Sequence, residues 1–199
     1  MARRPPPRLT ALLLLALSSG ATGGVAQSRP EPFQTVDLRL AVLADVSNGA
    51  LHRYWSPGAA YGAGVALPFY AGTVETGAQY ARPSPRRDGV PRFRSLFLYA
   101  GWGAEQKLSG RWQAGGGVRV GVLAMRFDGD TISVPSRRES EMGLALRAAL
   151  RWMPFDRWFT EAAVTYQSIL TRPRTEQVFL SLGIARRFDT PTWLRDFLD

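Results

Sequence analysis

Between residues 35 and 188 the chain alternates apolar and polar residues in stretches of about ten, the length that a tilted strand needs to cross a bilayer. The clearest stretch runs from Val36 to Val46, where one face is aliphatic and the other carries Asp37, Arg39 and Asp45. A soluble sheet would bury the apolar face, whereas a membrane barrel turns it toward lipid and keeps the charges in its lumen. The pattern predicts an all-β fold: an eight-stranded antiparallel up-and-down transmembrane β-barrel.

The first residues are typical of a secretory signal peptide. Arg3, Arg4 and Arg8 form a basic region, residues 9–17 form an apolar run too short to span a bilayer, and small residues lead to Ala26. A retained membrane anchor is the alternative. The predicted organisation is a cleaved signal peptide at 1–26, a periplasmic leader at 27–34, the barrel at 35–188 and a periplasmic tail at 189–199.

Charge and cysteine content narrow the possible partners. The formal net charge is +9, and it falls by three when the signal-peptide arginines are removed. A secreted basic chain meets anionic lipid headgroups before it meets nucleic acid, so we expect no nucleic-acid partner. The chain has no cysteine, which excludes a disulfide framework and a thiolate metal site. We expect neither a cofactor nor a metal.

Turn signals divide the region into eight predicted strands, with boundaries good to about two to four residues. They lie at 35–46, 58–69, 72–82, 92–104, 110–126, 140–152, 157–170 and 176–188. Long polar connections lie at 47–57, 83–91, 127–139 and 171–175, and short ones at 70–71, 106–109 and 154–156. Outer-membrane barrels have long extracellular loops and short periplasmic turns, so both ends of this barrel are predicted on the periplasmic side.

Aromatic residues gather at the short-turn ends of the predicted strands. They are Phe69, Tyr70, Trp102, Trp112, Trp152, Trp158 and Phe188. Aromatic rings favour the membrane interface, so this set predicts the periplasmic girdle. The facing of the strand at 92–104 stays open, because Phe93 and Phe97 share one parity while Arg94 has the other.

The last predicted strand carries the most specific piece of sequence. Leu182-Gly183-Ile184-Ala185-Arg186-Arg187-Phe188 resembles the closing-strand signal of the small eight-stranded outer-membrane barrels of the OmpA/OmpX type. The resemblance spans the whole predicted barrel. It implies an outer-membrane location and recognition by the outer-membrane assembly machinery through Gly183 and Phe188, and we expect a monomer. Family members often end at this aromatic residue, whereas here a tail follows, in which Thr190 and Pro191 predict the start of a short interfacial helix.

By the same resemblance the lumen is a packed polar core, because an eight-stranded barrel is just wide enough for side chains. Buried charges in that space need partners. The predicted ion network consists of Arg39, Glu75, Arg119, Glu141, Arg147 and Glu161. An ion pathway through these charges is the alternative.

Arginines in the predicted long loops are candidates for contact with lipopolysaccharide. Guanidinium groups bind phosphate oxygens in a forked, bidentate manner. The candidates are Arg86, Arg87, Arg137, Arg138, Arg172 and Arg174. Solvated charge without a partner is the alternative.

The only histidine, His52, lies near Asp45 and Ser47 in the sequence. A serine hydrolase needs a nucleophile, a base and an orienting carboxylate, but the residue pattern of lipid A deacylases is absent around His52, which we interpret as a solvated loop residue. The sequence therefore predicts an outer-membrane protein with a structural or surface-interaction role and no catalysis. The alternatives are a small-solute channel or transporter, a lipid A-modifying enzyme and a soluble secreted barrel.

Overall fold

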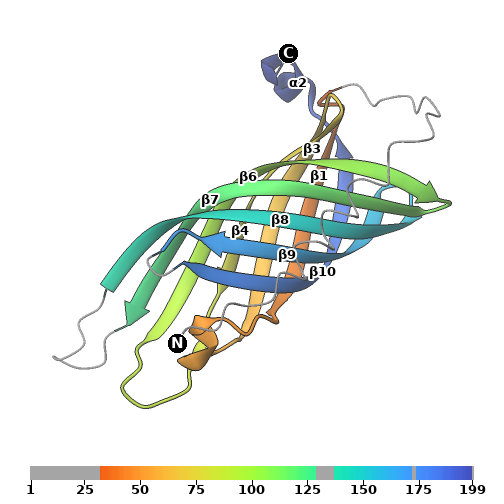
Figure 1. Cartoon of the computed structure of the whole chain (residues 1–199). Helices are drawn as coiled ribbons and strands as arrows, with labels where there is room; N and C mark the ends of the chain where they lie inside the picture. The colour runs from red at the N-terminus through yellow and green to blue at the C-terminus, as the bar shows by residue number, and fades with distance from the viewer. Residues whose placement is uncertain (1–31, 129–136, 172–173, 199) are drawn as a thin grey trace.

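The computed structural model describes residues 32–128, 137–171 and 174–198, and they form a closed antiparallel barrel (Figure 1). Around the barrel the strands follow the order β1-β10-β9-β8-β7-β6-β4-β3. Their bounds are β1 (Thr35–Asp45), β3 (Ala59–Phe69), β4 (Gly72–Ala81), β6 (Arg92–Ser109), β7 (Trp112–Asp128), β8 (Arg137–Phe155), β9 (Trp158–Ile169) and β10 (Thr175–Asp189). The barrel closes where β1 pairs with β10 along its whole length, from Thr35 opposite Asp189 to Asp45 opposite Phe179. The predicted eight-stranded up-and-down topology is confirmed.

Two of the three short turns lie beyond their predicted positions. Gly110 and Arg111 connect β6 to β7, where 106–109 was expected, and Asp156 and Arg157 connect β8 to β9, where 154–156 was expected. Gly110 has a φ of 53°, a left-handed conformation that glycine adopts at little cost. β6 therefore continues as far as Gly110, whose left-handed conformation allows the chain to turn back into β7.

Small elements lie within the loops after β1 and β4, for which the sequence predicts no regular structure. Residues Ala50–Arg53 form a 3-10 helix, η1, and β2 (Trp55–Ser56) pairs with β5 (Ser84–Pro85). The indole Nε1 of Trp55 donates a hydrogen bond to the Pro91 carbonyl at 2.9 Å. Two-residue strands are too short to leave a detectable periodicity, which explains why the sequence did not predict them.

The outward faces of the strands are apolar and exposed. Leu40 is 62 % exposed and Leu182 71 %, and the other exposed aliphatic residues include Leu38, Val42, Leu98, Val118, Val120, Val122, Leu144, Leu146, Leu150, Val164, Leu180 and Ile184. On β6, Leu96 and Leu98 point outward while Phe93 and Phe97 are buried inside, which settles the facing of that strand. An aliphatic surface on strand after strand is what lipid contact requires and what a water-soluble barrel avoids.

The aromatic girdle lies at the short-turn rim. Trp102, Trp112, Trp152 and Trp158 are 40 to 46 % exposed, and the rings of Trp112 and Trp152 lie on neighbouring strands with centroids 6.4 Å apart. Figure 1 shows the helix α2 (Thr192–Leu198) next to this rim, after the end of β10. In the described part of the chain no helix has the length and apolar character to cross a membrane.

The lumen has two different halves. In the half nearer the long loops, apolar side chains pack together in two clusters, one of Leu43, Ala60 and Phe179 and one of Phe97, Leu123 and Ile169. In the half nearer the short turns, the inward positions carry arginine, glutamate and aspartate. The interior of the barrel therefore has one apolar region and one charged region.

Candidate functional site

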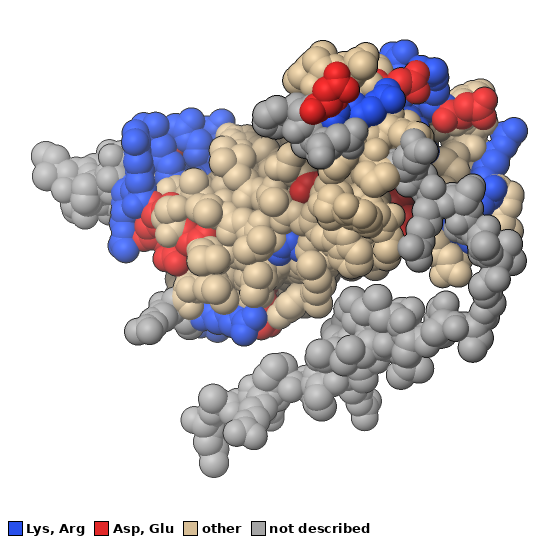
Figure 2. Space-filling model, turned by 90° about the horizontal axis from the view of Figure 1, so that it is seen from above, with Lys and Arg blue, Asp and Glu red and all other residues tan. Residues whose placement is uncertain are grey.

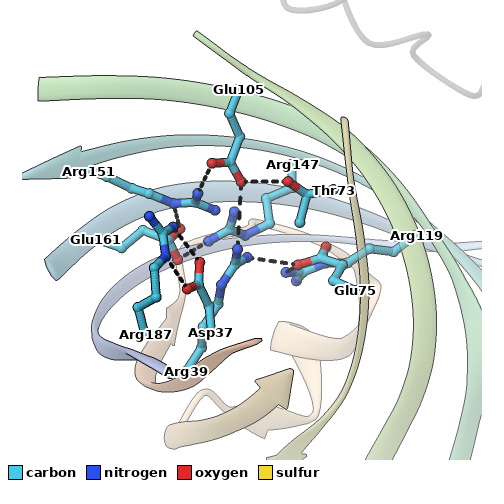
Figure 3. A network of polar contacts seen from close by, with 10 residues as sticks. All are labelled: Asp37, Arg39, Thr73, Glu75, Glu105, Arg119, Arg147, Arg151, Glu161 and Arg187. Carbon is cyan, nitrogen blue, oxygen red and sulfur yellow. Dashed lines mark hydrogen bonds and ion pairs between the residues drawn. The ribbon is translucent and has the colours of Figure 1, made fainter. Parts of the chain in front are cut away.

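The charged half of the lumen contains an ion network that draws side chains from seven strands (Figure 3). Glu75 on β4 accepts hydrogen bonds from Arg119 Nε at 2.6 Å, Arg119 Nη2 at 3.1 Å and Arg39 Nη1 at 3.1 Å. The Arg119 guanidinium also lies 4.2 Å from the centroid of the Tyr99 ring. Glu75 is therefore a shared counter-ion for two arginines from β1 and β7, and all three side chains are nearly buried.

A second shared counter-ion is Glu161 on β9. Its two carboxylate oxygens accept hydrogen bonds from Arg147 and, at 2.7 Å, from Arg151 Nε. Arg151 also pairs with Glu105, and Arg39 Nη2 lies 3.6 Å from Glu105 Oε1. Glu105 thus links the two shared carboxylates into one network that crosses the lumen.

A bidentate pair stands at the seam where the barrel closes. Arg187 on β10 lies opposite Asp37 on β1. The Nε and Nη2 atoms of Arg187 donate to the two Asp37 oxygens at 2.7 and 2.9 Å. This geometry joins the first and last strands through side chains as well as backbone hydrogen bonds.

Five of the six predicted network residues come together in this half of the lumen: Arg39, Glu75, Arg119, Arg147 and Glu161. The sixth prediction, Glu141, is wrong: Glu141 makes no ion pair with any residue that the structure describes. It lies opposite Leu123, in the apolar half, several residues along β8 from Arg147. The period of two therefore predicts correctly that Glu141 faces inward. It does not specify how far along the barrel axis the residue lies.

The network also contains four charged residues that the sequence prediction omitted, Asp37, Glu105, Arg151 and Arg187. Asp37, Arg151 and Arg187 lie at inward positions of the alternating sequence. Arg151 lies opposite Glu161 because the β8–β9 turn is at Asp156 and Arg157. Glu105 was missed because its strand was expected to end one residue earlier. The correct position of the β6–β7 turn would have added Glu105 to the inward-facing residues.

The outer wall carries a row of three arginines near the long loops. Arg94 on β6 lies opposite Arg126 on β7, and Arg126 lies opposite Arg138 on β8. All three share the outward parity of their strands, and Arg94 and Arg126 are 47 and 50 % exposed. Asp128 Oδ1 lies 3.5 Å from Arg94 Nη2 and 3.9 Å from Arg126 Nε. We call Arg94, Arg126 and Arg138 the arginine row. Figure 2 shows Lys and Arg side chains, with acidic ones among them, gathered at both ends of the molecule and few charged atoms between.

The predicted lipopolysaccharide-contact residues have different positions. Arg86 and Arg87 are exposed after β5, and Arg137 and Arg138 begin β8, because the strand starts earlier than expected. Arg174 donates from Nε to the Ser168 hydroxyl at 2.5 Å. Arg172 lies outside the described residues. The sequence did not point to Arg94 and Arg126, since the facing of β6 was undetermined and the pairing register was unknown.

His52 is not the solvated residue that the sequence suggested. Its side chain is 16 % exposed, and its Nε2 lies 3.0 Å from Asp45 Oδ2 and 3.5 Å from the Ser47 hydroxyl. A catalytic triad places the carboxylate and the nucleophile on different ring nitrogens, whereas here both face Nε2. Ser47 instead donates to Asp45 Oδ1 at 2.5 Å, and Gln177 Nε2 donates to Asp45 Oδ2 at 3.1 Å. The cluster therefore fixes the end of β1 and does not match nucleophile activation.

The two predicted assembly residues lie on β10 at the seam. A Cβ added to Gly183 would lie 2.7 Å from the Leu40 carbonyl oxygen and 3.1 Å from the Ala41 Cβ, so the close approach of β1 requires glycine. Phe188 lies opposite Val36, and the Arg186 guanidinium lies 4.9 Å from its ring centroid. Their role in assembly stays a prediction.

Three solved barrels are similar to this chain. Neisserial surface protein A (NspA) has a TM-score of 0.60 and 11 % identity, over 77 % of this chain and 96 % of that one. Ail of Yersinia pestis, in complex with the heparin analogue sucrose octasulfate, has a TM-score of 0.54 and 12 % identity, over 78 % and 99 %. OprG of Pseudomonas aeruginosa has a TM-score of 0.55 and 13 % identity, over 79 % and 97 %. No protein-family model and no curated protein matches the chain.

These likenesses concern the fold, because the identities are low. The shared features are a closed barrel and a nearly complete overlap with each solved chain. The resemblance that the closing strand suggested is confirmed at this level. The chain has the fold of the small eight-stranded outer-membrane β-barrels.

Proposed function

We propose that this protein is a non-enzymatic outer-membrane barrel whose outer wall binds the phosphate groups of lipopolysaccharide and whose packed lumen does not conduct. The arginine row is the observation that carries the surface role. Directly opposed residues on neighbouring strands have Cβ atoms about 5 Å apart, and like charges at that spacing destabilise a sheet. A row of three arginines is favourable only where an anion lies against it, and the one carboxylate beside it is Asp128 among the described residues.

The height of the arginine row on the wall fits a lipid headgroup. The next outward positions toward the middle of the barrel are Leu96, Ala124 and Ser140, and the following ones are Leu98, Val122 and Met142. Two residues along a strand span about 7 Å, so the guanidinium groups stand just above the apolar band. Lipid A phosphates lie at that level of the outer leaflet, and arginine binds phosphate through paired hydrogen bonds.

Further arginines extend the basic surface beyond the row. Arg92 lies opposite Asp128 at the start of β6, and Arg137 is 74 % exposed at the start of β8. Arg86 and Arg87 are exposed in the preceding loop. A phosphorylated saccharide that is bound at the arginine row and extends toward the long loops can therefore contact further guanidinium groups.

The lumen supports a structural role and not a channel. Nine charged side chains that belong to the ion network occupy its short-turn half, and most of them are nearly buried by one another and by Tyr99. An ion could pass only if several of these pairs separated at once. A small-solute channel is the second candidate function. Conductance measurements in planar bilayers distinguish it from a closed, packed lumen.

The test of the surface role compares two triple variants in outer membranes that contain lipopolysaccharide. Arg94→Gln/Arg126→Gln/Arg138→Gln removes the row, while Arg111→Gln/Arg157→Gln/Arg195→Gln removes three exposed arginines at the short-turn end. After mild detergent extraction, mass spectrometry measures the lipid A that stays bound to each folded barrel. We expect the row variant to lose most of its lipid A and the control variant to keep it. Equal retention by both variants would overturn the proposal.

A further inference from the structure

The charged residues of the ion network do not balance. Among the described residues that belong to it, five arginines face four carboxylates. Arg187 and Asp37 form a complete bidentate pair at the seam. The other arginines are Arg39, Arg119, Arg147 and Arg151, and they share the glutamates Glu75, Glu105 and Glu161. This part of the lumen therefore holds one positive charge without a counter-ion, and a buried charge that is not compensated is strongly destabilising.

The unbalanced charge lies at Arg39. Its Nη1 donates to Glu75 at 3.1 Å, but Glu75 already accepts hydrogen bonds from both Nε and Nη2 of Arg119. Its Nη2 lies 3.6 Å from Glu105 Oε1, too far for a hydrogen bond, and its buried Nε makes no hydrogen bond with any described residue. Figure 3 shows the Arg39 side chain reaching toward both glutamates. Buried polar groups are nearly always hydrogen-bonded, so Arg39 needs a further acceptor.

A small cavity lies between the ion network and the wall formed by β6 and β7. The arginines that line it are Arg39, Arg147 and Arg151. On the wall, its lining includes inward positions that carry no side chain, Gly103, Gly115 and Gly117. Its volume suits about one water molecule or one monatomic ion. Glu105, which also lines the cavity, is 24 % exposed, so solvent reaches this part of the network.

The lining groups that are free to bind a guest are hydrogen-bond donors. Glu75 and Glu105 also line the cavity, but each of their carboxylate oxygens is already paired with a guanidinium or with the Thr73 hydroxyl. A guanidinium only donates hydrogen bonds, so the guest of Arg39 must accept them. A water molecule would accept from Arg39 but would leave the excess positive charge unchanged, and a metal cation would increase it. The cavity therefore favours a small anion.

We propose that this cavity binds one monatomic anion of the halide class, such as chloride, which serves as the counter-ion of Arg39. The bound anion makes the negative charges of the network equal in number to the positive ones. It enters from the short-turn side, because the apolar clusters around Leu43 and Phe97 fill the other half of the lumen. The site shares no residue with the arginine row, so either proposal can fail without the other.

The first test measures whether chloride stabilises the folded barrel. Urea unfolds the protein in lipid vesicles while chloride replaces gluconate at constant ionic strength, so that the screening of surface charges stays the same. Because a ligand of the folded state shifts unfolding by mass action, we expect the ratio of folded to unfolded protein to rise saturably, by at least about fivefold between about 1 and about 300 mM chloride. Bromide should replace chloride, whereas the larger sulfate ion should not. Equal ratios in chloride and gluconate would overturn the proposal.

Two glycine variants separate binding in the cavity from general effects of salt. Gly115→Ala directs a methyl group into the cavity, where its Cβ would lie 3.4 Å from the Ala104 carbonyl oxygen and 3.4 Å from Glu105 Cγ, which are ordinary contacts. Gly116→Ala places the same group on the outward face of β7, 3.5 Å from the Arg147 carbonyl oxygen. We expect Gly115→Ala to lose most of the chloride effect and Gly116→Ala to keep it. Equal chloride effects in the two variants would contradict the site.

Two further measurements identify the partner of the anion and its position. Arg39→Gln makes the arginines and carboxylates of the network equal in number, so the unfolding of this variant should no longer depend on chloride. Crystals grown in bromide should show an anomalous scattering peak in the cavity beside Arg39. A wild-type chloride effect in Arg39→Gln, or a bromide peak only outside the cavity, would overturn the proposal. A peak in the cavity without any chloride effect on unfolding would mean an adventitious ion only, and would also overturn it.

Discussion

Arg151 on β8 lies directly opposite Glu161 on β9, and its Nε donates a hydrogen bond to the carboxylate at 2.7 Å. Arg147 donates to the other oxygen of the same carboxylate. Glu161→Gln therefore leaves two nearly buried guanidinium groups without their common counter-charge. We expect the free energy of unfolding to fall by about 3 to 5 kcal/mol, measured by urea titration in lipid vesicles.

Glu141→Gln is the matched control for Glu161→Gln. It changes the same residue type on the inward face of β8, at a position without an ion pair to any described residue. We expect a change within about 0.5 kcal/mol. Similar losses at Glu141 and Glu161 would contradict the assignment of the network to the short-turn half.

The second prediction concerns the lipid-facing surface. Leu40 is 62 % exposed in the middle of β1, so Leu40→Arg places a charge in the centre of the apolar band. We expect a loss of about 2 to 4 kcal/mol in vesicle unfolding. Leu108→Arg, next to the β6–β7 turn, should cost about 0 to 1 kcal/mol, since charges near the interface remain hydrated. Equal tolerance at both positions would argue against lipid contact at Leu40.

The third prediction concerns conduction through the lumen. The wild-type barrel in a planar bilayer should show no stable single-channel steps, because ion pairs cross its short-turn half. A wide porin of sixteen or more strands in the same membrane is the positive control, since its lumen holds water. Reproducible steps from the wild-type protein would instead favour the small-solute channel.

The fourth prediction concerns assembly. If β10 carries the closing-strand signal, Phe188→Ala should lower the amount of folded barrel in the outer membrane and raise periplasmic degradation. Phe155→Ala is the control, because Phe155 is also an aromatic residue at the short-turn rim but belongs to β8. Fractionation followed by heat-modifiable gel mobility measures both. Normal insertion of the Phe188→Ala chain would show that recognition does not depend on this aromatic residue.

The alternation in the sequence was sufficient to predict the fold, since each inward or outward position follows from a period of two. Leu40, Val120 and Leu182 face outward, and Arg39, Glu75 and Arg119 face inward, as parity requires. Parity alone does not determine depth, which depends on the turn that fixes each register. For this reason Glu141 was assigned to the network and Glu105 was not.

The arginine row and the ion network depend on the register between strands, which the sequence of a single strand does not specify. The arginine row exists because Arg94, Arg126 and Arg138 share one register across three strands, although they are far apart in the chain. Glu75 on β4 and Arg119 on β7 pair in the lumen only after the strands between and around them have assembled into the barrel. The position of His52 depends on η1, which is too short to be detected from periodicity.

Because the strands differ in length, the barrel has a taller side and a shorter side. The β7–β8 ladder extends to Phe127 opposite Arg137, whereas the β8–β9 ladder stops at Gly143 opposite Ile169. The arginine row lies on the taller side, and near the long-loop ends of β1 and β10 the outward residues are Ala44 and Leu180. A molecule that diffuses in the plane of the membrane therefore contacts arginine side chains if it approaches the side formed by β6, β7 and β8. It contacts aliphatic side chains if it approaches the side formed by β1 and β10.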